Sequence, residues 1–237
     1  MAQHVEGRNA VVEALKSGRA LKVWLSHSAT GRTIDEIVKL CKEREIPFER
    51  VANEVILSKV ETENHQGVLA ETADLPQTTL EEIIALEDPF VVILDHIQDP
   101  HNLGAIIRTA EAAGVDAVII ADKRAATMTA GAIKASAGAV EYIPIMTVAN
   151  IAQTIEYLKR GNIWIVGTAD EAEKTHTECD LRGRLAIVIG SEGEGLSRLV
   201  RDKCDFLVRI PMKGKISSLN ASVATGVILY EAVRQRY

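Results

Sequence analysis

The chain has 237 residues, of which 47% are hydrophobic and 25% are charged. This balance is typical of a globular protein with a packed core and excludes a disordered chain. No apolar run approaches the roughly 20 residues that cross a bilayer, and the first residues lack the basic and apolar regions of a secretion signal. We therefore expect a cytoplasmic protein with no membrane partner.

The three cysteines, Cys41, Cys179 and Cys204, are odd in number and far apart in the sequence. This pattern argues against a disulfide framework and against a thiolate metal site, so we expect reduced thiols and no bound metal. The formal net charge is −6, but residues 196–237 carry eight basic and three acidic side chains. A local basic face is enough to attract phosphate, because charges more than about 10 Å away are largely screened.

Residues 1–72 show the pattern of a small α/β domain, of a size that suits an independent module. The predicted helices cover 11–16 and 33–44, and the predicted strands cover 23–26, 46–49 and 67–70. Residues 73–89 are expected to be a linker, in which Thr79 and Glu82 have the spacing of a capping box for one short acidic helix.

From Phe90 onward, short apolar runs alternate with helical patterns, which predicts a mainly parallel sheet covered on both faces. The predicted strands are 90–95, 117–121, 141–146, 163–168, 185–190 and 206–210, and the predicted helices are 102–113, 129–136, 151–160, 196–203 and 218–234. Ligands bind such sheets beyond the carboxyl ends of the strands. Four residues stand at such ends: Asp95, Thr168, Gly190 and Ile210.

The strongest local signal is the turn Gly190-Ser-Glu-Gly-Glu-Gly195, because glycines after a strand let backbone N–H groups approach a ligand. Its spacing is not that of a dinucleotide fingerprint, and its two carboxylates would repel a pyrophosphate. Glu192 and Glu194 suit a ligand that is cationic or rich in hydroxyls and amines. A tight strand-to-helix connection is the plainer alternative.

The predicted helix 102–113 begins after a polar segment that contains two histidines and two aspartates without regular metal-ligand spacing. Asn102 stands where an N-cap is expected. Arg108 falls on the face away from the apolar stripe, where it is either simply solvated or functional.

The last predicted helix begins near Ser217-Ser218-Leu219-Asn220, with Ser217 or Ser218 as the expected N-cap. Neither serine has a histidine or acidic partner at a spacing diagnostic of a nucleophile. Residues 221–227 are small or apolar nearly all round, so this helix should be buried on most faces, in a tightly threaded core or against a second subunit.

Three segments together resemble, in order and spacing, the motifs of the SpoU/TrmH ribose 2'-O-methyltransferases. They are Asn102-x-Gly104-xxx-Arg108-Thr109-Ala110-xxx-Gly114, Gly190-x-Glu192-xx-Gly195, and Ile210-Pro211-Met212-x-Gly214-xxx-Ser218-Leu219-Asn220. Gly7-Arg8-Asn9-Ala10-Val11 and His65-Gln66-Gly67 resemble the front domain of the bacterial 23S rRNA guanosine-2'-O-methyltransferases. From the residues alone, these two polar clusters could equally be turns and caps.

The resemblance implies S-adenosylmethionine as methyl donor, RNA as substrate, a homodimer with no DNA partner, an L30e-like RNA-binding front domain and a deep trefoil knot in the parallel-sheet domain 90–237. General fold rules would not propose the knot, because threaded chains are nearly absent among folds. The residues that match the family's catalytic positions are Asn102, Arg108, Glu192, Ser218 and Asn220. The cofactor positions are Thr168, Gly190, Gly195, Ile210, Met212 and Leu219. The RNA-binding positions are Arg8, Asn9, His65 and Gln66.

The favoured substrate is a guanosine of 23S rRNA. The alternatives within the same fold are 2'-O-methylation of tRNA and a non-catalytic RNA-binding relative. A nicotinamide-dependent oxidoreductase fits the α/β pattern, but it does not fit the glycine spacing or the acidic turn.

Overall fold

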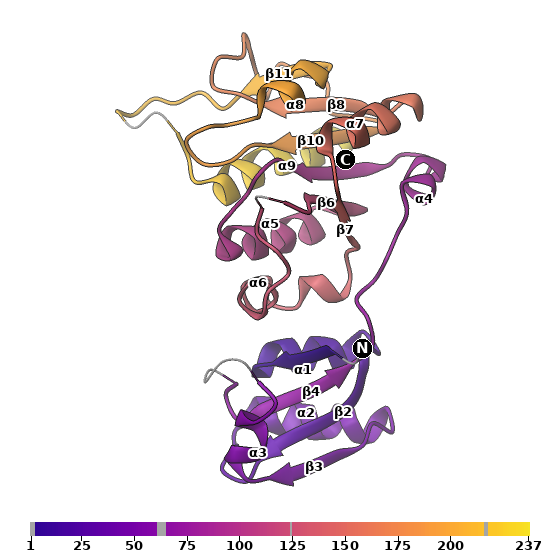
Figure 1. Cartoon of the computed structure of the whole chain (residues 1–237), viewed down its shortest axis with the longest axis vertical. Coiled ribbons are helices and arrows are strands. Elements are labelled where there is room, and N and C mark those ends of the chain that lie inside the picture. The colour runs from indigo at the N-terminus through magenta and orange to yellow at the C-terminus, as the bar shows by residue number, and fades with distance from the viewer. Residues whose placement is uncertain (1–2, 61–64, 124, 216–217) are drawn as a thin grey trace.

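The computed structural model describes residues 3–60, 65–123, 125–215 and 218–237. Its strands form two separate sheets, one of four strands and one of seven (Figure 1). We call residues 3–72 the front unit and residues 90–237 the back unit. Residue 217, one of the two serines expected to cap the last helix, lies outside the described residues.

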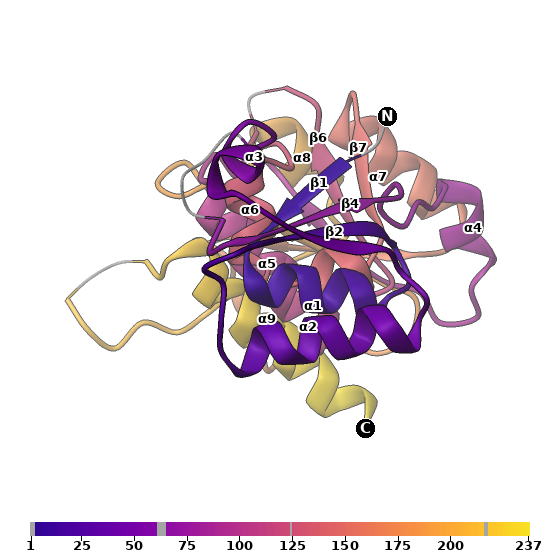
Figure 2. The same cartoon turned by 90° about the horizontal axis from the view of Figure 1, so that it is seen from below.

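The front sheet has the strand order β1-β4-β2-β3. Its strands are β1 (Gln3–Glu6), β2 (Ala20–Ser26), β3 (Phe48–Val51) and β4 (Val68–Thr72), and its helices are α1 (Arg8–Lys16), α2 (Arg32–Glu43) and α3 (Asn53–Leu57). Side chains alternate between the two faces along β2: Val23 and Leu25 pack against α1 and α2, whereas Trp24 packs with Ile56 of α3. Figure 2 shows α1 and α2 on one side of this sheet and α3 on the other.

The segment between the two sheets contains one short helix, α4 (Leu80–Ala85). The Thr79 hydroxyl accepts a hydrogen bond from the Glu82 backbone N–H, and the Glu82 carboxylate accepts one from the Thr79 N–H. The predicted capping box is therefore confirmed.

The back sheet is parallel throughout, with the order β7-β6-β5-β10-β8-β11-β9. Its strands are β5 (Phe90–Leu94), β6 (Ala117–Ala121), β7 (Ile145–Val148), β8 (Trp164–Thr168), β9 (Lys174–Thr175), β10 (Leu185–Ile189) and β11 (Phe206–Arg209). This confirms the predicted α/β class with a parallel sheet. The predicted strand at 141–146 is wrong at its start, because Ala139–Glu141 form a 3-10 turn, η1, and β7 begins at Ile145.

Helices cover both faces of the back sheet, as its continuously apolar strands require. The helices are α5 (Pro100–Ala112), α6 (Ala130–Ala135), α7 (Ile151–Arg160), α8 (Arg198–Lys203) and α9 (Ala221–Arg236). Along β5, Val92 and Leu94 face the core under α5 and α9, whereas Val91 and Ile93 face the core under α7 and α8. No helix in the described part of the chain is long and apolar enough to cross a membrane.

Candidate functional site

The candidate site lies at the carboxyl edge of the back sheet, beyond four adjacent strands. β5, β10, β8 and β11 are neighbours, and being parallel they end at the same edge. The loops that follow β10 and β11 are the glycine turn from Gly190 and the segment from Ile210. Both line one cavity of about 620 Å³, a volume in the range of small-molecule sites.

The glycine turn folds back on itself as a compact loop. The Ser191 and Gly195 backbones exchange two hydrogen bonds of 3.0 Å, and Gly193 and Gly195 have φ angles of +89° and +66°. At Gly190 a Cβ would lie 2.2 Å from the Gly195 carbonyl carbon, so only glycine permits this approach. The turn is therefore a rigid wall of exposed backbone.

Asp95, which follows β5, anchors the far end of this turn. Its carboxylate is fully buried and accepts a hydrogen bond of 2.7 Å from the Ser197 backbone N–H and one of 2.6 Å with His96 Nδ1. Reasoning from the sequence placed Asp95 at a strand end but missed this role. A buried strand ending in aspartate at a carboxyl edge was the available signal, since a buried carboxylate must find donors.

Three side chains from distant segments form a hydrogen-bonded cluster at the cavity rim. Glu192 Oε1 accepts from Asn102 Nδ2 at 2.8 Å and from Asn220 Nδ2 at 2.7 Å, and Asn220 Nδ2 also approaches Asn102 Oδ1 at 3.0 Å. The glycine turn, α5 and the start of α9 are therefore tied together through one carboxylate. Each of the three resembling motifs contributes one member of this cluster.

Two expected N-caps are wrong. Asp99 caps α5 by accepting from the His101 N–H at 2.9 Å, and Pro100 occupies the first helical position, so Asn102 lies inside the first turn with its amide free for Glu192. Asn220, not Ser218, caps α9, because its Oδ1 accepts from the backbone N–H groups of residues 222 and 223. Asn220 thus serves both the helix and the cluster.

The cavity contains nearly all of the residues predicted for the back unit. The predicted residues that line it are Thr168, Gly190, Glu192, Gly195, Ile210, Met212, Ser218, Leu219 and Asn220. Asn102 is not among the lining residues but contacts the cavity residues Glu192 and Asn220. Arg108 is placed apart: it is exposed on α5, it does not line the cavity, and its guanidinium forms no hydrogen bond or ion pair with another described residue.

The electrostatics of the cavity favour a cation. Four carboxylates line it, from Asp170, Glu171, Glu192 and Glu194, against the two guanidinium groups of Arg201 and Arg209. Glu171 receives a hydrogen bond from its own backbone N–H and another from Arg201 at 2.7 Å, which together hold the pKa of its carboxyl below the usual range. This carboxylate is therefore ionised at neutral pH.

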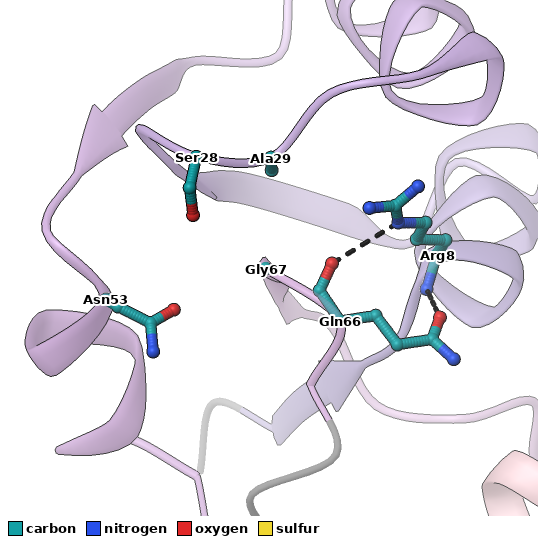
Figure 3. Close-up of a pocket in the computed structure, with 6 residues that line it drawn as sticks. All are labelled: Arg8, Ser28, Ala29, Asn53, Gln66 and Gly67. Carbon is teal, nitrogen blue, oxygen red and sulfur yellow. Dashed lines mark hydrogen bonds between the residues drawn. The ribbon is translucent and has the colours of Figure 1, made fainter.

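The front unit has its own hollow, of about 590 Å³, which Figure 3 shows from close by. Gln66 and Arg8 hold each other there: Gln66 Oε1 accepts from the Arg8 backbone N–H at 3.1 Å, and Arg8 Nε donates to the Gln66 carbonyl at 3.3 Å. Ser28, Ala29, Asn53 and Gly67 line the rest of the hollow. In this view the Asn53 side-chain amide extends toward the hollow, whereas the Ser28 hydroxyl is hydrogen-bonded to that of Ser26 at 2.9 Å.

The other two residues predicted to bind RNA differ in exposure. Asn9 is exposed beside Arg8 at the start of α1. His65 is only 5% exposed, and its Nδ1 accepts a hydrogen bond of 3.0 Å from the Gly67 N–H. The imidazole therefore shapes the turn that presents Gln66, whose φ is +54°.

Comparison with known protein families identifies the family to which the chain belongs. Residues 89–230 match the model of the SpoU rRNA Methylase family, and residues 4–78 match that of RNA 2'-O ribose methyltransferase substrate binding. The chain belongs to the SpoU rRNA methylase family.

Relatives within the SpoU family match nearly the whole chain. The 23S rRNA (guanosine-2'-O-)-methyltransferase RlmB of Escherichia coli (strain K12) is 40% identical over 242 residues, covering 100% of both chains. RlmB of Pseudomonas putida is 43% identical over 223 residues, covering 92% of this chain and 90% of its own. The crystal structure of the SpoU methyltransferase AviRb from Streptomyces viridochromogenes, in complex with AdoMet, superimposes with a TM-score of 0.82 at 27% identity, covering 99% of this chain and 90% of AviRb.

Two further findings concern possible metal ligands and thiols among the residues of this SpoU-family chain that the structure describes. No group of three or more histidine, cysteine or acidic side chains is arranged to hold a metal ion there. Burial raises the pKa of the Cys204 thiol to about 12 and that of Cys41 to about 11. At neutral pH these thiols are protonated, as expected of structural cysteines.

Proposed function

We propose that this SpoU-family protein transfers the methyl group of S-adenosylmethionine to the 2'-hydroxyl of a ribose in RNA, and that the ribose belongs to a guanosine of 23S rRNA. The observation that carries the proposal is the single cavity that joins the glycine turn, the segment from Ile210 and the Asn102–Glu192–Asn220 cluster. The guanosine of 23S rRNA is supported by the relatives of matching length that are named for that substrate.

The cavity residues fit S-adenosylmethionine in size, polarity and charge. Ile210, Met212 and Leu219 offer apolar contact for an adenine, and the glycine turn offers backbone groups for hydrogen bonds. The carboxylates around the cavity complement a ligand that carries a sulfonium and an ammonium group. S-adenosylmethionine would supply the methyl group there, and the glycine turn and the segment from Ile210 would hold the cofactor, orient it toward the ribose and exclude water.

The ribose must also be positioned and must lose its hydroxyl proton. We assign orientation of the ribose and cofactor to Asn102, Glu192, Ser218 and Asn220. The polar atoms of Asn102, Glu192 and Asn220 meet at the cavity rim, and Ser218 lines the cavity. Arg108 is a poor base, because a guanidinium has a pKa above about 12. Its proposed role is to bind the substrate phosphate and stabilise the developing alkoxide, with the proton passing to phosphate or water.

Arg108 would reach the cavity from a second copy of the chain. It is exposed on α5, which packs beside α9. On α9 the side chains of Val223, Val227 and Tyr230 are 52%, 36% and 52% exposed and follow one another at helical spacing, so they form an apolar stripe that a partner could cover. We therefore propose a homodimer in which each cavity is completed by the partner's guanidinium.

The proposed domain organisation follows the two sheets. Residues 1–72 form an L30e-like RNA-binding domain, residues 73–89 connect it, and residues 90–237 form the methyltransferase domain with a deep trefoil knot. The boundaries are supported by the end of β4 at Thr72 and the start of β5 at Phe90. The knot is supported by the two separate loops and the start of α9 that converge on one cavity. A cytoplasmic enzyme with no DNA or membrane partner completes the proposal.

Single-turnover methylation of an rRNA fragment tests the role of Arg108. Arg108→Ala should lower the rate by roughly 100-fold, since one group positioned to stabilise a developing oxyanion lowers the transition-state free energy by about 2.7–4 kcal/mol. Arg108→Lys should recover part of the loss. If both variants retain near wild-type rates with RNA bound normally, the role assigned to Arg108 is wrong.

Mixing two inactive variants tests the shared site. In a heterodimer of Arg108→Ala with Asn220→Ala, one cavity combines an intact pocket with an intact arginine from the partner. An equal mixture should therefore recover about a quarter of wild-type activity if the subunits exchange freely. If exchanged heterodimers recover nothing, Arg108 serves the cavity of its own chain.

A further inference from the structure

A buried ion pair joins the front unit to the back unit. Arg19, which follows α1, meets Glu141 of η1 through two hydrogen bonds, Nε to Oε2 at 2.6 Å and Nη2 to Oε1 at 2.8 Å. The two side chains are only 9% and 1% exposed. Ser17 Oγ also donates to Glu141 at 3.0 Å, and Arg19 donates to the carbonyl of Ala73. Both charges are thus fully engaged at the junction.

A second contact lies beside this pair. The Tyr142 hydroxyl donates to Glu13 of α1 at 2.8 Å. Gly138 packs directly on the same glutamate, because a Cβ at Gly138 would lie 2.5 Å from Glu13 Cγ, and its φ of +96° also favours glycine. The junction is therefore closely fitted on both sides of η1.

Such a junction selects one orientation of the two units. A buried ion pair contributes little net stability, because desolvation offsets the attraction, but it is costly to separate one charge from the other. The guanidinium and the carboxylate are planar and bond in parallel, so the attraction depends on angle as well as distance. Any other orientation of the front unit would leave a buried charge without its partner or expose both.

The fixed orientation matters because two candidate contact sites lie on the same side of the molecule. The front hollow is lined by Asn53 of α3, and the back cavity is lined by Ile210, Met212 and residues 218–221. In both Figure 1 and Figure 2, α3 and residues 210–215 lie toward the left of the molecule. One RNA could therefore contact the front hollow while placing a ribose in the back cavity.

We propose that Arg19 and Glu141 are positioning residues that determine which ribose is methylated. By fixing the front unit on the back unit, they hold the RNA-contacting hollow at one distance from the transfer cavity, so that a bound RNA offers the same nucleotide each time. The proposal rests on the RNA methyltransferase function proposed above. Neither side chain lines either cavity, so both act through the placement of RNA and not on the reacting atoms.

The test compares Glu141→Gln, Arg19→Lys and a control, Asp180→Asn, in the full-length protein. Glu141→Gln keeps the shape of the side chain and removes its charge, and Arg19→Lys keeps the charge and loses the parallel bonding. Asp180→Asn makes the same carboxylate-to-amide change in an exposed pair with Arg182, where the side chains are 64% and 67% exposed. Three quantities are measured: the map of ribose methylation along an rRNA fragment, the affinity for S-adenosylhomocysteine, and the distribution of overall dimensions by small-angle X-ray scattering.

For Glu141→Gln we expect methylation at the wild-type position, relative to neighbouring riboses, to fall by about tenfold or more, because an unpaired buried guanidinium releases the junction. Scattering should show a broader distribution of dimensions, and cofactor affinity should stay within about twofold of wild type, because the junction is remote from the cavity. Arg19→Lys should give a smaller change in the same direction, and Asp180→Asn should match wild type.

The inference is overturned if Glu141→Gln, with unchanged cofactor affinity, methylates the same single position at the wild-type rate. It is also overturned if the scattering changes while the methylation map does not. A failure of the proposed function itself would look different, because wild type and Asp180→Asn would then transfer no methyl group to RNA either.

Discussion

Replacing Gly190 by alanine tests whether the glycine turn forms the wall of the cofactor cavity. The added Cβ would lie 2.2 Å from the carbonyl carbon of Gly195 and 2.4 Å from both its oxygen and the nitrogen of Leu196. All three are backbone atoms, which no side-chain rotation can move away. Because non-bonded carbon atoms pack about 3.5–4.0 Å apart, the turn would have to shift by more than about 1 Å.

The cost of this shift can be estimated from what holds the turn in place. Moving Gly195 strains its two hydrogen bonds with Ser191, at 3.0 Å each, and the bond of 2.7 Å from the Ser197 N–H to buried Asp95. Losing two or three such bonds costs about 1 kcal/mol each, and overpacking adds about 1–3 kcal/mol. If the turn instead relaxes into a shape that lacks its cofactor contacts, the free energy of cofactor binding becomes less favourable by about 3 kcal/mol. This loss weakens binding by more than about 100-fold.

Calorimetric titration with S-adenosylhomocysteine measures this loss. Gly214→Ala is the matched control, because Gly214 lies in the second loop and a Cβ there meets nothing within 4 Å. It should bind within about twofold of wild type. If Gly190→Ala is folded and as thermally stable as wild type, yet binds the ligand within about threefold of the wild-type affinity, the glycine turn does not form the cofactor wall.

Three further predictions concern the cluster, the thiols and α9. Glu192→Gln should slow single-turnover methylation by about tenfold, because hydrogen bonds to a neutral acceptor are weaker than those to a carboxylate by about 1 kcal/mol. A rate within about twofold of wild type would show that the Asn102–Glu192–Asn220 cluster does not orient the ribose and cofactor. Cys204 has its folded-state pKa raised to about 12 by burial, so the stability it confers is complete below its unfolded value of 9.0 and is lost as pH rises through 12. Iodoacetamide at pH 8 should therefore label this partly buried thiol far more slowly in native protein than in urea, and equal rates would show that the fold does not hold the thiol protonated. Val223→Asp should convert the proposed dimer to monomers in light scattering while cofactor binding persists, whereas an unchanged dimer would show that the α9 stripe is not the interface.

The central strands of the back unit could be predicted from sequence because β5, β6 and β10 are continuous apolar runs in which every residue is buried. β5 and β6 were expected within one residue of their observed ends, as was α7. The elements that escaped prediction are short or polar: β1 (Gln3–Glu6), α3 (Asn53–Leu57) and the two-residue β9 (Lys174–Thr175). Their positions depend on pairing and packing partners that a local pattern does not contain.

Where the prediction for a single residue was wrong, contacts with other parts of the fold explain the difference. Glu141 was expected in a strand, but its carboxylate is bound by Arg19, 122 residues away in the sequence. Asn102 was expected as a cap, but Asp99 followed by Pro100 is the better cap and leaves Asn102 for Glu192. Pro100 was the local sequence signal for the Asp99 cap. No local sequence pattern predicts that Asn220 contacts Glu192 or that Arg108 lies outside the cavity of its own chain.

The most direct test of the account is methyl transfer to rRNA followed by mapping of the product. The protein is incubated with S-adenosylmethionine carrying a labelled methyl group and with 23S rRNA that lacks ribose methylation, and the labelled nucleotide is then identified. We expect label on one ribose 2'-oxygen of a guanosine with wild-type protein and none with Asn220→Ala. Label on a base, or equal transfer by Asn220→Ala, would contradict the assignment of the cavity as the site of 2'-O-methylation.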